Sequence, residues 1–338
     1  MGEYPAYDDD VYDAFDAADD RCRAYRDAIR STAADRVVLD IGTGRDALWA
    51  IEAARCGARH VYAIEADPTA AARAARTVAT AGVGDRVTVL PGLSTEQTLP
   101  VRAELCVSEI IGNIASAEGA IPVLDDARRR LTAPGCVWIP FRMQTWAAAV
   151  DLTAAAPLAL AAESLPYLRA VFAAAGPPFD PRLCLAGPAG ETIVSTAAPL
   201  ESAVFTAATH PPHGPPHDAV TTADLRIEVA ARVTGLLLWV RVAAASTGGR
   251  EIDALAGGTR GWAPVYVPIA AAGLPVRAGD RMPVGFARRT GDDHLHPDYE
   301  ITVDGRQAWH SPHHGGPFRA SEFYRDLFGV DLGYWNVA

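Results

Sequence analysis

The stretch VVLDIGTGRDALWAIEAARCGARHVYAIEAD, residues 37–67, decides the fold of this chain. It opens with an apolar run that ends in Asp40 and a Gly-x-Gly turn at Gly42 and Gly44. A helical stretch follows, and then a second apolar run that ends in Glu65. Apolar runs that alternate with helices of this length predict a mostly parallel sheet whose ligands bind at the carboxyl ends of its strands.

The alternation continues on both sides of this stretch. Residues 8–30 predict an N-terminal helix, with acids early and arginines late, as the helix dipole prefers. Residues 86–92 and 103–111 predict two further strands, and residues 121–135 predict the helix that follows them.

The pattern changes after Pro140. Residues 142–152 alternate like a strand, and the Ala-rich patch 154–176 predicts a helix. Strand-like runs separated by Gly, Pro and Asp then recur, as in a sandwich or barrel. These runs are 189–197, 201–208, 224–233, 235–244, 263–271, 281–289 and 298–305. We therefore expect an α/β chain with an N-terminal helical segment (1–36), a Rossmann-like domain (37–140) and a β-barrel-like domain (141–338).

The composition limits the class of partner. The formal net charge of −11 argues against nucleic acid and is compatible with a small cationic substrate. No apolar run is long enough to span a bilayer and the N-terminal residues are acidic, so we expect a cytoplasmic protein with no membrane partner. The five cysteines have no zinc spacing, and the histidine clusters at 210–217 and 310–314 are typical of Pro-rich surface loops, so we expect no metal.

The Gly-x-Gly turn and Glu65 together predict a nucleotide-like ligand. Glycines let the backbone approach a ligand without a Cβ clash. A carboxylate at the end of the next strand can accept hydrogen bonds from both hydroxyls of a ribose. These features fit a dinucleotide or S-adenosylmethionine (SAM), and a tight turn beside a solvated acid is the alternative without a ligand.

Residues 37–67, with RVTVLPGLSTEQTLP (86–100), resemble the SAM motifs of the protein arginine N-methyltransferase family. The resemblance implies SAM as the cofactor, with Arg21 pairing with its carboxylate and Ser94 and Thr95 contacting its adenine. It also implies a helical dimerisation arm within 154–185, and hence a homodimer. The implied cofactor-binding residues are Arg21, Asp40, Gly42, Gly44, Glu65, Ser94 and Thr95. The chain departs from the family at Asp46, where the first motif has its third glycine.

SEIIGNIASAEG, residues 108–119, places Glu109 and Glu118 nine residues apart on either side of Gly112. This resembles the family's loop of paired glutamates, which converge on a guanidinium. Such a group is planar, carries five N–H donors and stays protonated, so two carboxylates can grip it through charge-assisted bonds. The resemblance implies that Glu109 binds the acceptor and takes up the released proton, and that Glu118 orients the acceptor.

TRGWAPVYVPI, residues 259–269, matches the family's Thr-His-Trp segment, with Gly261 in place of the histidine. Trp262 and Phe15 then join Glu109 and Glu118 as the expected substrate-binding residues. The expected activity is methyl transfer from SAM to an ω-nitrogen of arginine.

The Ala-rich, lysine-free composition is typical of a high-GC bacterial genome. It favours free L-arginine in specialised-metabolite (antibiotic) biosynthesis, as in the bacterial branch that methylates arginine early in streptozotocin biosynthesis. Peptidyl arginine or another amine or hydroxyl metabolite is the alternative acceptor. A nicotinamide-dependent oxidoreductase and an inactive scaffold homologue are the alternatives of another class.

Overall fold

The computed structural model describes residues 19–153, 183–185, 189–206, 218–256, 262–270, 272–291 and 294–311. They belong to two compact units, which we describe one at a time. The first takes its residues from 1–145, 201–217 and 239–263, and the second from 146–200, 218–238 and 264–338. The domain boundaries expected from the sequence stay predictions. No helix in the described part of the chain is long and apolar enough to cross a membrane.

A parallel five-stranded sheet with the order β3-β2-β1-β4-β5 forms the centre of the first unit. Its strands are β1 (Val37–Ile41), β2 (His60–Glu65), β3 (Val87–Pro91), β4 (Ala103–Ser108) and β5 (Thr132–Ile139). All five residues of β1 are buried, as expected of a central strand with both faces covered. The predicted Rossmann-like sheet is confirmed.

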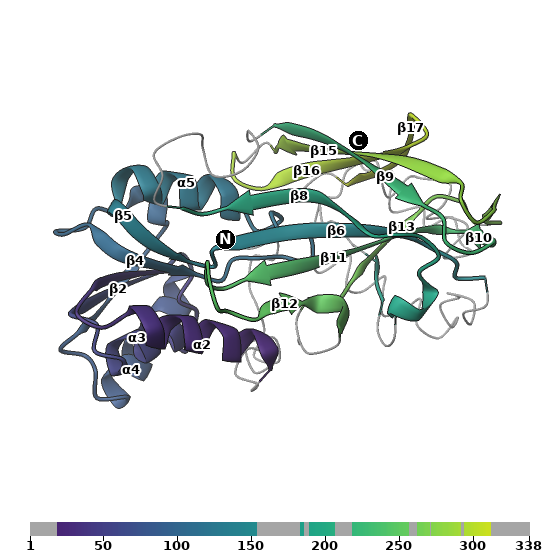
Figure 1. Cartoon of the computed structure of the whole chain (residues 1–338). Helices are drawn as coiled ribbons and strands as arrows, with labels where there is room; N and C mark the ends of the chain where they lie inside the picture. Colours follow the sequence, from purple (N-terminus) through teal and green to yellow (C-terminus); the bar gives the residue numbers. More distant parts are fainter. Residues whose placement is uncertain are drawn as a thin grey trace, which may run out of the picture. The chain divides into compact units, whose positions relative to one another are not determined.

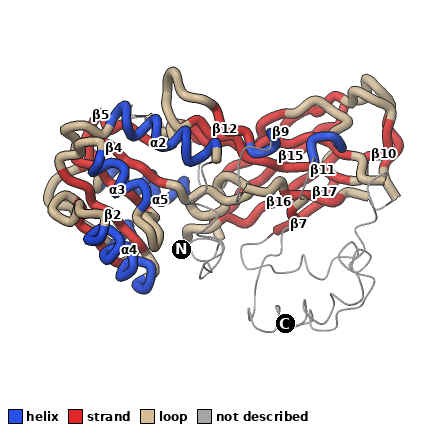
Figure 2. The backbone as a smooth tube through the Cα atoms, turned by 90° about the horizontal axis from the view of Figure 1, so that it is seen from below, coloured by secondary structure: helices blue, strands red, loops and turns tan. Residues whose placement is uncertain are grey.

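Within the described residues, four α-helices pack on this sheet: α2 (Asp20–Thr32), α3 (Leu48–Arg55), α4 (Pro68–Thr80) and α5 (Ala120–Arg130). Crossovers between parallel strands are right-handed. The chain passes from β1 to β2 and β3 in one direction and from β4 to β5 in the other, so the connecting helices lie on opposite faces of the sheet. Figures 1 and 2 show α2, α3 and α4 on one face of the sheet and α5 on the other. Asp19 begins α2 by accepting the Cys22 N–H (2.8 Å), and Asp67 begins α4 in the same way, just before Pro68.

Two predicted element ends were wrong. The strand expected over 103–111 ends at Ser108, level with Ile41 at the end of β1, so Glu109 lies just beyond the sheet. The helix expected over 121–135 ends at Arg130, and Thr132 already begins β5. Pro134 explains the second error, because proline has no N–H and disfavours helical geometry in the residue before it.

Antiparallel strands dominate the rest of the chain. One sheet has the order β7-β13-β11-β6-β8, with β12 added to β11; a second has the order β17-β16-β15-β9, and β10 pairs with β14. The strands are β6 (Arg142–Val150), β7 (Leu183–Cys184), β8 (Ala198–Val204), β9 (Ala219–Arg226), β10 (Ala231–Val233), β11 (Gly235–Ala243), β12 (Glu251–Asp253), β13 (Val265–Pro268), β14 (Leu274–Val276), β15 (Arg281–Thr290), β16 (Pro297–Val303) and β17 (Arg306–Ser311). The α/β chain with a second, antiparallel part is therefore confirmed.

Three strand and loop predictions need correction. Residues 189–192 form a 3-10 helix, η3 (Ala189–Thr192), in which the Thr192 hydroxyl bonds the Ala189 carbonyl and so competes with strand pairing. The run 224–233 is divided into β9 and β10, because the Ile227 and Glu228 amides bond Asp280 and Val194. His310, expected in a loop, lies in β17. Short 3-10 helices also occur at η1 (Ser94–Glu96) and η4 (Ala254–Ala256).

Some sequence predictions fall outside the described residues. They are Phe15, the first part of the N-terminal helix, the histidine cluster 210–217, Gly261 and most of the expected arm at 154–185.

Candidate active site

The glycine loop, residues 42–46, connects β1 to α3. Gly42 and Gly44 have φ angles of +73° and +66°, which glycine adopts without strain. A Cβ on Gly42 would lie 2.7 Å from the side chain of Ile110, so only glycine fits there. The loop lies at the carboxyl end of β1, and its contact with a ligand stays a prediction.

Glu65 holds this loop from the end of the neighbouring strand. Its Oε2 accepts the Gly44 N–H (2.8 Å), and its Oε1 accepts the Asp67 N–H (3.0 Å). The side chain is half-buried. An ionised carboxylate has about four acceptor positions, so these two backbone bonds orient the group and are compatible with further hydroxyl donors.

Asp40 lies beneath the same loop and is fully buried. Its Oδ2 accepts the Thr43 hydroxyl (2.6 Å). Burial raises the pKa of Asp40 to about 7, the Thr43 hydrogen bond offsets part of this rise, and the negative charge of Glu65 adds to it. A cationic ligand beside Asp40 would favour its ionised form.

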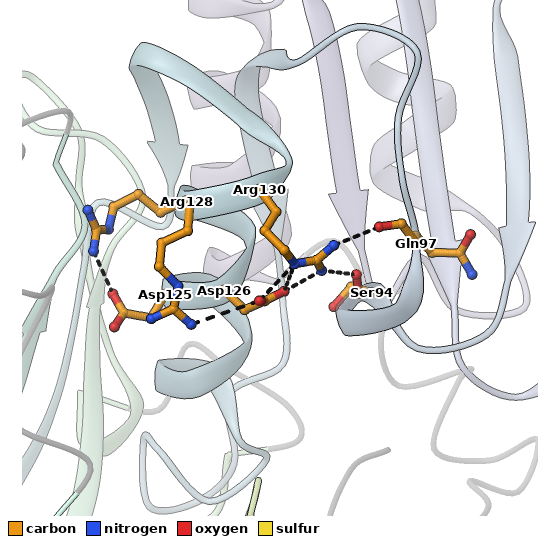
Figure 3. Close-up of polar contacts among 7 residues, drawn as sticks. Ser94, Gln97, Asp125, Asp126, Arg128 and Arg130 are labelled. Carbon is orange, nitrogen blue, oxygen red and sulfur yellow. Dashed lines mark hydrogen bonds and ion pairs between the residues drawn. The ribbon is translucent and has the colours of Figure 1, made fainter.

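The segment expected to contact adenine is η1, with Ser94 buried and Thr95 half-buried. Figure 3 shows how α5 holds this segment: Arg130 donates to the carbonyls of Ser94 (2.9 Å) and Gln97 (2.8 Å) while Asp126 accepts its Nε (2.9 Å). The hydrogen bonds that Arg130 donates to Asp126 raise the pKa of Arg130 above its ordinary value. The ion pair of Arg130 and Asp126 on α5 therefore connects η1 to this helix.

Arg21, on α2, lies in the interior of the first unit with only 1% of its side chain exposed. Its Nη1 is 3.6 Å from Oε2 of Glu109, and its Cζ lies 5.3 Å from the centre of the Trp262 ring. Trp262 is itself held by a hydrogen bond from its Nε1 to the Ile111 carbonyl (2.8 Å). The structure thus brings two predicted site residues, Glu109 and Trp262, to the guanidinium of a third, Arg21.

Glu109 is buried, with 7% of its side chain exposed. Burial raises the pKa of Glu109 to about 8; the Arg21 charge opposes this rise, and the charges of Glu118 and Asp19 add to it. The influence of Glu118 shows that the two glutamates are close enough to interact. A second cation placed between them would lower this pKa and ionise the carboxylate.

The glutamate loop, residues 109–119, is folded tightly on itself. The Ala117 and Gly119 amides donate to the carbonyls of Ile114 (2.9 Å) and Ser116 (3.0 Å). A Cβ on Gly112 would lie 2.8 Å from the Cβ of Ala117, so this position also needs glycine. Glu118 is half-buried at the end of the loop.

Several residues of the candidate site carry no sequence motif that would have predicted them. Tyr25 is fully buried, donates its hydroxyl to the Ser108 carbonyl (3.3 Å) and stacks on Trp49. Arg130 and Glu201 belong to no motif. The sequence does carry a signal for Glu201. Alternate side chains of a strand point to the same face, and Glu201 alternates with the buried apolar residues Ala203, in β8, and Phe205, just after it. Within the described residues, no group of His, Cys, Asp and Glu side chains is arranged to hold a metal ion.

Comparison with known proteins bears on this geometry. The profile of the ribosomal protein L11 methyltransferase family (PrmA) matches residues 23–139. Protein arginine N-methyltransferase 1 of Chlamydomonas reinhardtii is 36% identical over 124 residues, which are 36% of this chain and 35% of that protein. Protein arginine N-methyltransferase 7 of Gallus gallus is 32% identical over 135 residues, 38% of this chain and 19% of that protein. The chain therefore spans about a third or less of these relatives.

The fold likeness extends further along the chain. The crystal structure of Arabidopsis thaliana protein arginine methyltransferase 10 aligns with a TM-score of 0.67 at 18% identity, over 89% of this chain and 95% of that one. The Trypanosoma brucei PRMT1 enzyme–prozyme heterotetrameric complex with AdoHcy aligns with a TM-score of 0.65 at 20% identity, over 86% and 92%. At these identities the likeness shows a shared fold.

Residues 23–139 therefore match the profile of a methyltransferase family, and the chain shares its fold with two arginine methyltransferase structures. The curated relatives that match part of this chain are protein arginine N-methyltransferases.

Proposed function

We propose that the chain transfers a methyl group from SAM to an ω-nitrogen of an arginine guanidinium, and that the acceptor is free L-arginine. One observation carries the choice of a guanidinium: Glu109 already lies 3.6 Å from one, that of Arg21, which is also packed over the face of Trp262. Planar cations of this kind bind carboxylates and stack on aromatic rings.

The residues of the first unit fit SAM. Glu65 is oriented to accept hydroxyl donors beside the glycine loop, and Arg21 is a buried cation suited to the carboxylate of the cofactor. Ser94 and Thr95, in the segment held by Arg130, are the proposed contacts of the adenine ring. Bound SAM supplies an electrophilic methyl group on a sulfonium that leaves as a neutral thioether.

The two glutamates do the work on the acceptor side. Glu118 orients the guanidinium, and Glu109 draws its positive charge toward one end, which leaves the other terminal nitrogen more electron-rich. Holding this nitrogen in line with the methyl group is worth about 7–11 kcal/mol in well-oriented pairs. Transfer of the methyl group would release a proton from the attacking nitrogen, and Glu109 would accept that proton and pass it to solvent. Its raised pKa suits it to accept a proton near neutral pH.

The choice of free L-arginine rests on composition and on the sequence of the loop. Ile110, Ile111 and Asn113 belong to the glutamate loop and differ from the residues of the arginine methyltransferase family there. The lysine-free sequence is typical of high-GC bacteria that make specialised metabolites. We place the reaction in such a biosynthesis, in the manner of bacterial enzymes that methylate arginine for streptozotocin. We also propose a cytoplasmic location, in line with five cysteines that are all free thiols.

The test is incubation of the purified protein with SAM and L-arginine, followed by mass spectrometry. Arginine that gains one or two methyl groups is the expected product, and Glu109→Gln and Glu118→Gln should each form it far more slowly than the wild type. An arginine-containing peptide and agmatine, assayed in parallel, locate the acceptor: methylation of the peptide alone would overturn the choice of free arginine. Normal turnover by both Gln variants would overturn the guanidinium mechanism.

We further propose that the protein is a homodimer, as expected from the arm at 154–185. One of the structures with a similar fold is a heterotetrameric complex, so a protein of this fold assembles with other chains in that case. Light scattering on a size-exclusion column should give twice the mass of one chain. The mass of a single chain at micromolar concentration would contradict this.

A further inference from the structure

A buried carboxylate outside every sequence motif lies against the glutamate loop. Glu201, on β8, is 5% exposed. Its Oε1 accepts the Ser116 N–H (3.1 Å) and the Thr145 hydroxyl (2.7 Å), and its Oε2 accepts the Ser116 hydroxyl (2.8 Å). A single side chain therefore binds Ser116 through both its backbone and its hydroxyl.

Thr145, on β6, extends this network by one residue. Its hydroxyl oxygen accepts the Ala115 N–H (2.8 Å) and donates its own proton to Glu201. A hydroxyl has one donor and two acceptor positions, so both bonds are satisfied at once. Two successive amides of the loop, those of Ala115 and Ser116, thus end on Glu201, one directly and one through Thr145.

These contacts determine where the loop can lie. Ser116 is two residues before Glu118, and the hydrogen bond from the Gly119 N–H to the Ser116 carbonyl (3.0 Å) spans Glu118 itself. Ile114, Ala115 and Ala117 are buried, so this segment has little room to shift. The backbone that carries Glu118 is therefore attached at its centre to strands β6 and β8.

We propose that Glu201 is a positioning residue, which holds Ser116 and thereby sets the Glu118 carboxylate at the place where it meets the cationic acceptor together with Glu109. This inference rests on the function proposed above, because it assigns Glu201 to the acceptor side of that reaction. A carboxylate suits the task, since it accepts all three donors while an uncharged side chain of the same shape presents at least one donor of its own. Glu201 acts through the loop and does not itself touch the acceptor.

The experiment compares Glu201→Ala, Glu201→Gln and Ser116→Ala with the wild-type enzyme. Glu201→Ala removes the acceptor of all three bonds. Glu201→Gln keeps the shape, and the Ser116 hydroxyl can turn to accept from the new amide. Ser202→Ala is the matched control: it is the next residue of β8, it points to the opposite face, and it loses the bond from Gln144 (3.2 Å). For each variant we would measure the KM of both substrates, kcat, the midpoint of thermal unfolding and the backbone hydrogen exchange of residues 111–119.

A displaced glutamate loop predicts a specific pattern. Glu201→Ala should raise the KM of the acceptor and lower kcat. Together these changes should lower kcat/KM by about 10- to 100-fold, since a misplacement of about 1 Å costs that much. Hydrogen exchange over residues 111–119 should become faster. The KM of SAM should stay as in the wild type. Glu201→Gln and Ser116→Ala should fall between, and they carry the test if Glu201→Ala does not fold. Ser202→Ala should match the wild type.

Three results would overturn the proposal. One is unchanged acceptor KM and unchanged exchange over 111–119 in Glu201→Ala or, if it does not fold, in both milder variants. Another is an equal rise in the KM of both substrates, which would indicate a general loss of structure. The third is the same pattern in Ser202→Ala. Failure of the proposed function is distinguishable, because it would show in the wild-type enzyme as absence of methylated arginine, whereas the exchange measurement needs no acceptor.

Discussion

Two loops of the first unit carry the proposed chemistry, and they are held in different ways. The glycine loop and η1 are attached by backbone hydrogen bonds to half-buried groups: Glu65 holds Gly44, and Arg130, with 34% of its side chain exposed, holds Ser94. The glutamate loop is attached by a more deeply buried group, since Glu201, which accepts hydrogen bonds from Ser116, is 5% exposed.

The difference follows from what each loop has to bind. A cofactor with many polar groups can share its binding energy over several modest hydrogen bonds. The charge of a guanidinium has to be met by carboxylates in a low-dielectric setting, where electrostatic interactions are strong and a lost partner is costly. The comparison therefore predicts large effects on the acceptor side and smaller ones on the cofactor side.

The largest effect is expected for Glu109→Gln. Loss of one partner in a buried charged pair typically costs about 2–5 kcal/mol, so kcat/KM for the acceptor should fall by about 30- to 5000-fold. SAM affinity, measured by calorimetry, should change far less. If SAM binding weakened as much as turnover, the two loops would not be separable in the way the structure indicates.

A second test addresses the cofactor loop through Glu65→Ala. The variant loses the acceptor of the Gly44 N–H and the proposed ribose contact, and bonds to charged groups contribute about 1.5–3 kcal/mol each, so the Kd of SAM should rise about 10- to 100-fold. The acceptor KM at saturating SAM should stay near the wild-type value. An increase confined to the acceptor KM would reverse the assignment of the two loops.

The pH profile sharpens the comparison further. Burial raises the pKa of Glu109 to about 8, and only the ionised form grips a cation, so kcat/KM for the acceptor should rise about tenfold per pH unit below that value and level off above it. The bound guanidinium stabilises the carboxylate, so the inflection in kcat should lie at lower pH. The assignment would be contradicted if the wild-type profile had no inflection, or if the inflection remained in Glu109→Gln.

The same pKa has a consequence for stability with the opposite sign. Between the ordinary value of 4.5 and about 8, Glu109 is protonated in the folded chain and ionised in the unfolded chain. Folding then binds a proton, and the free energy of unfolding falls as the pH rises through this window. The cofactor-free wild type should lose thermal stability over this range relative to Glu109→Gln, which does not titrate.

The smallest effect is expected for Arg130→Ala, at about two- to fivefold in the Kd of SAM, because the residue is partly exposed and its ion pair with Asp126 is screened by solvent. Arg129→Ala is the control: it removes another arginine of α5 whose pair with the same Asp126 is longer, at 3.8 Å. Equal effects of the two substitutions would show that the anchoring of η1, drawn in Figure 3, has no influence on cofactor binding.

Much of the fold was predictable because the relevant patterns are local. The two apolar runs around the Gly-x-Gly turn, and the strand-end acids Asp40 and Glu65, are short-range features that dictate a parallel sheet with a ligand edge. The error at 224–233 arose where distant partners intervene, because the Ile227 and Glu228 amides bond Asp280 and Val194. Residues 189–192 form a 3-10 helix with a local bond from the Thr192 hydroxyl to the Ala189 carbonyl.

The sequence by itself determined the α/β fold class, because the alternation of apolar runs and helices is a local pattern. The ligand-binding roles of the glycine loop with Glu65, and of Glu109 with Glu118, were expected from spacing and family resemblance and stay predictions. Only the tertiary structure decided that Arg21 and Trp262 lie at Glu109 and that Glu201 holds Ser116. Those contacts join segments 85 or more positions apart. Burial where such segments meet raises the pKa of Glu109 and allows Glu201 to accept three hydrogen bonds. It leaves no local pattern in the sequence, because it depends on residues far apart in the chain.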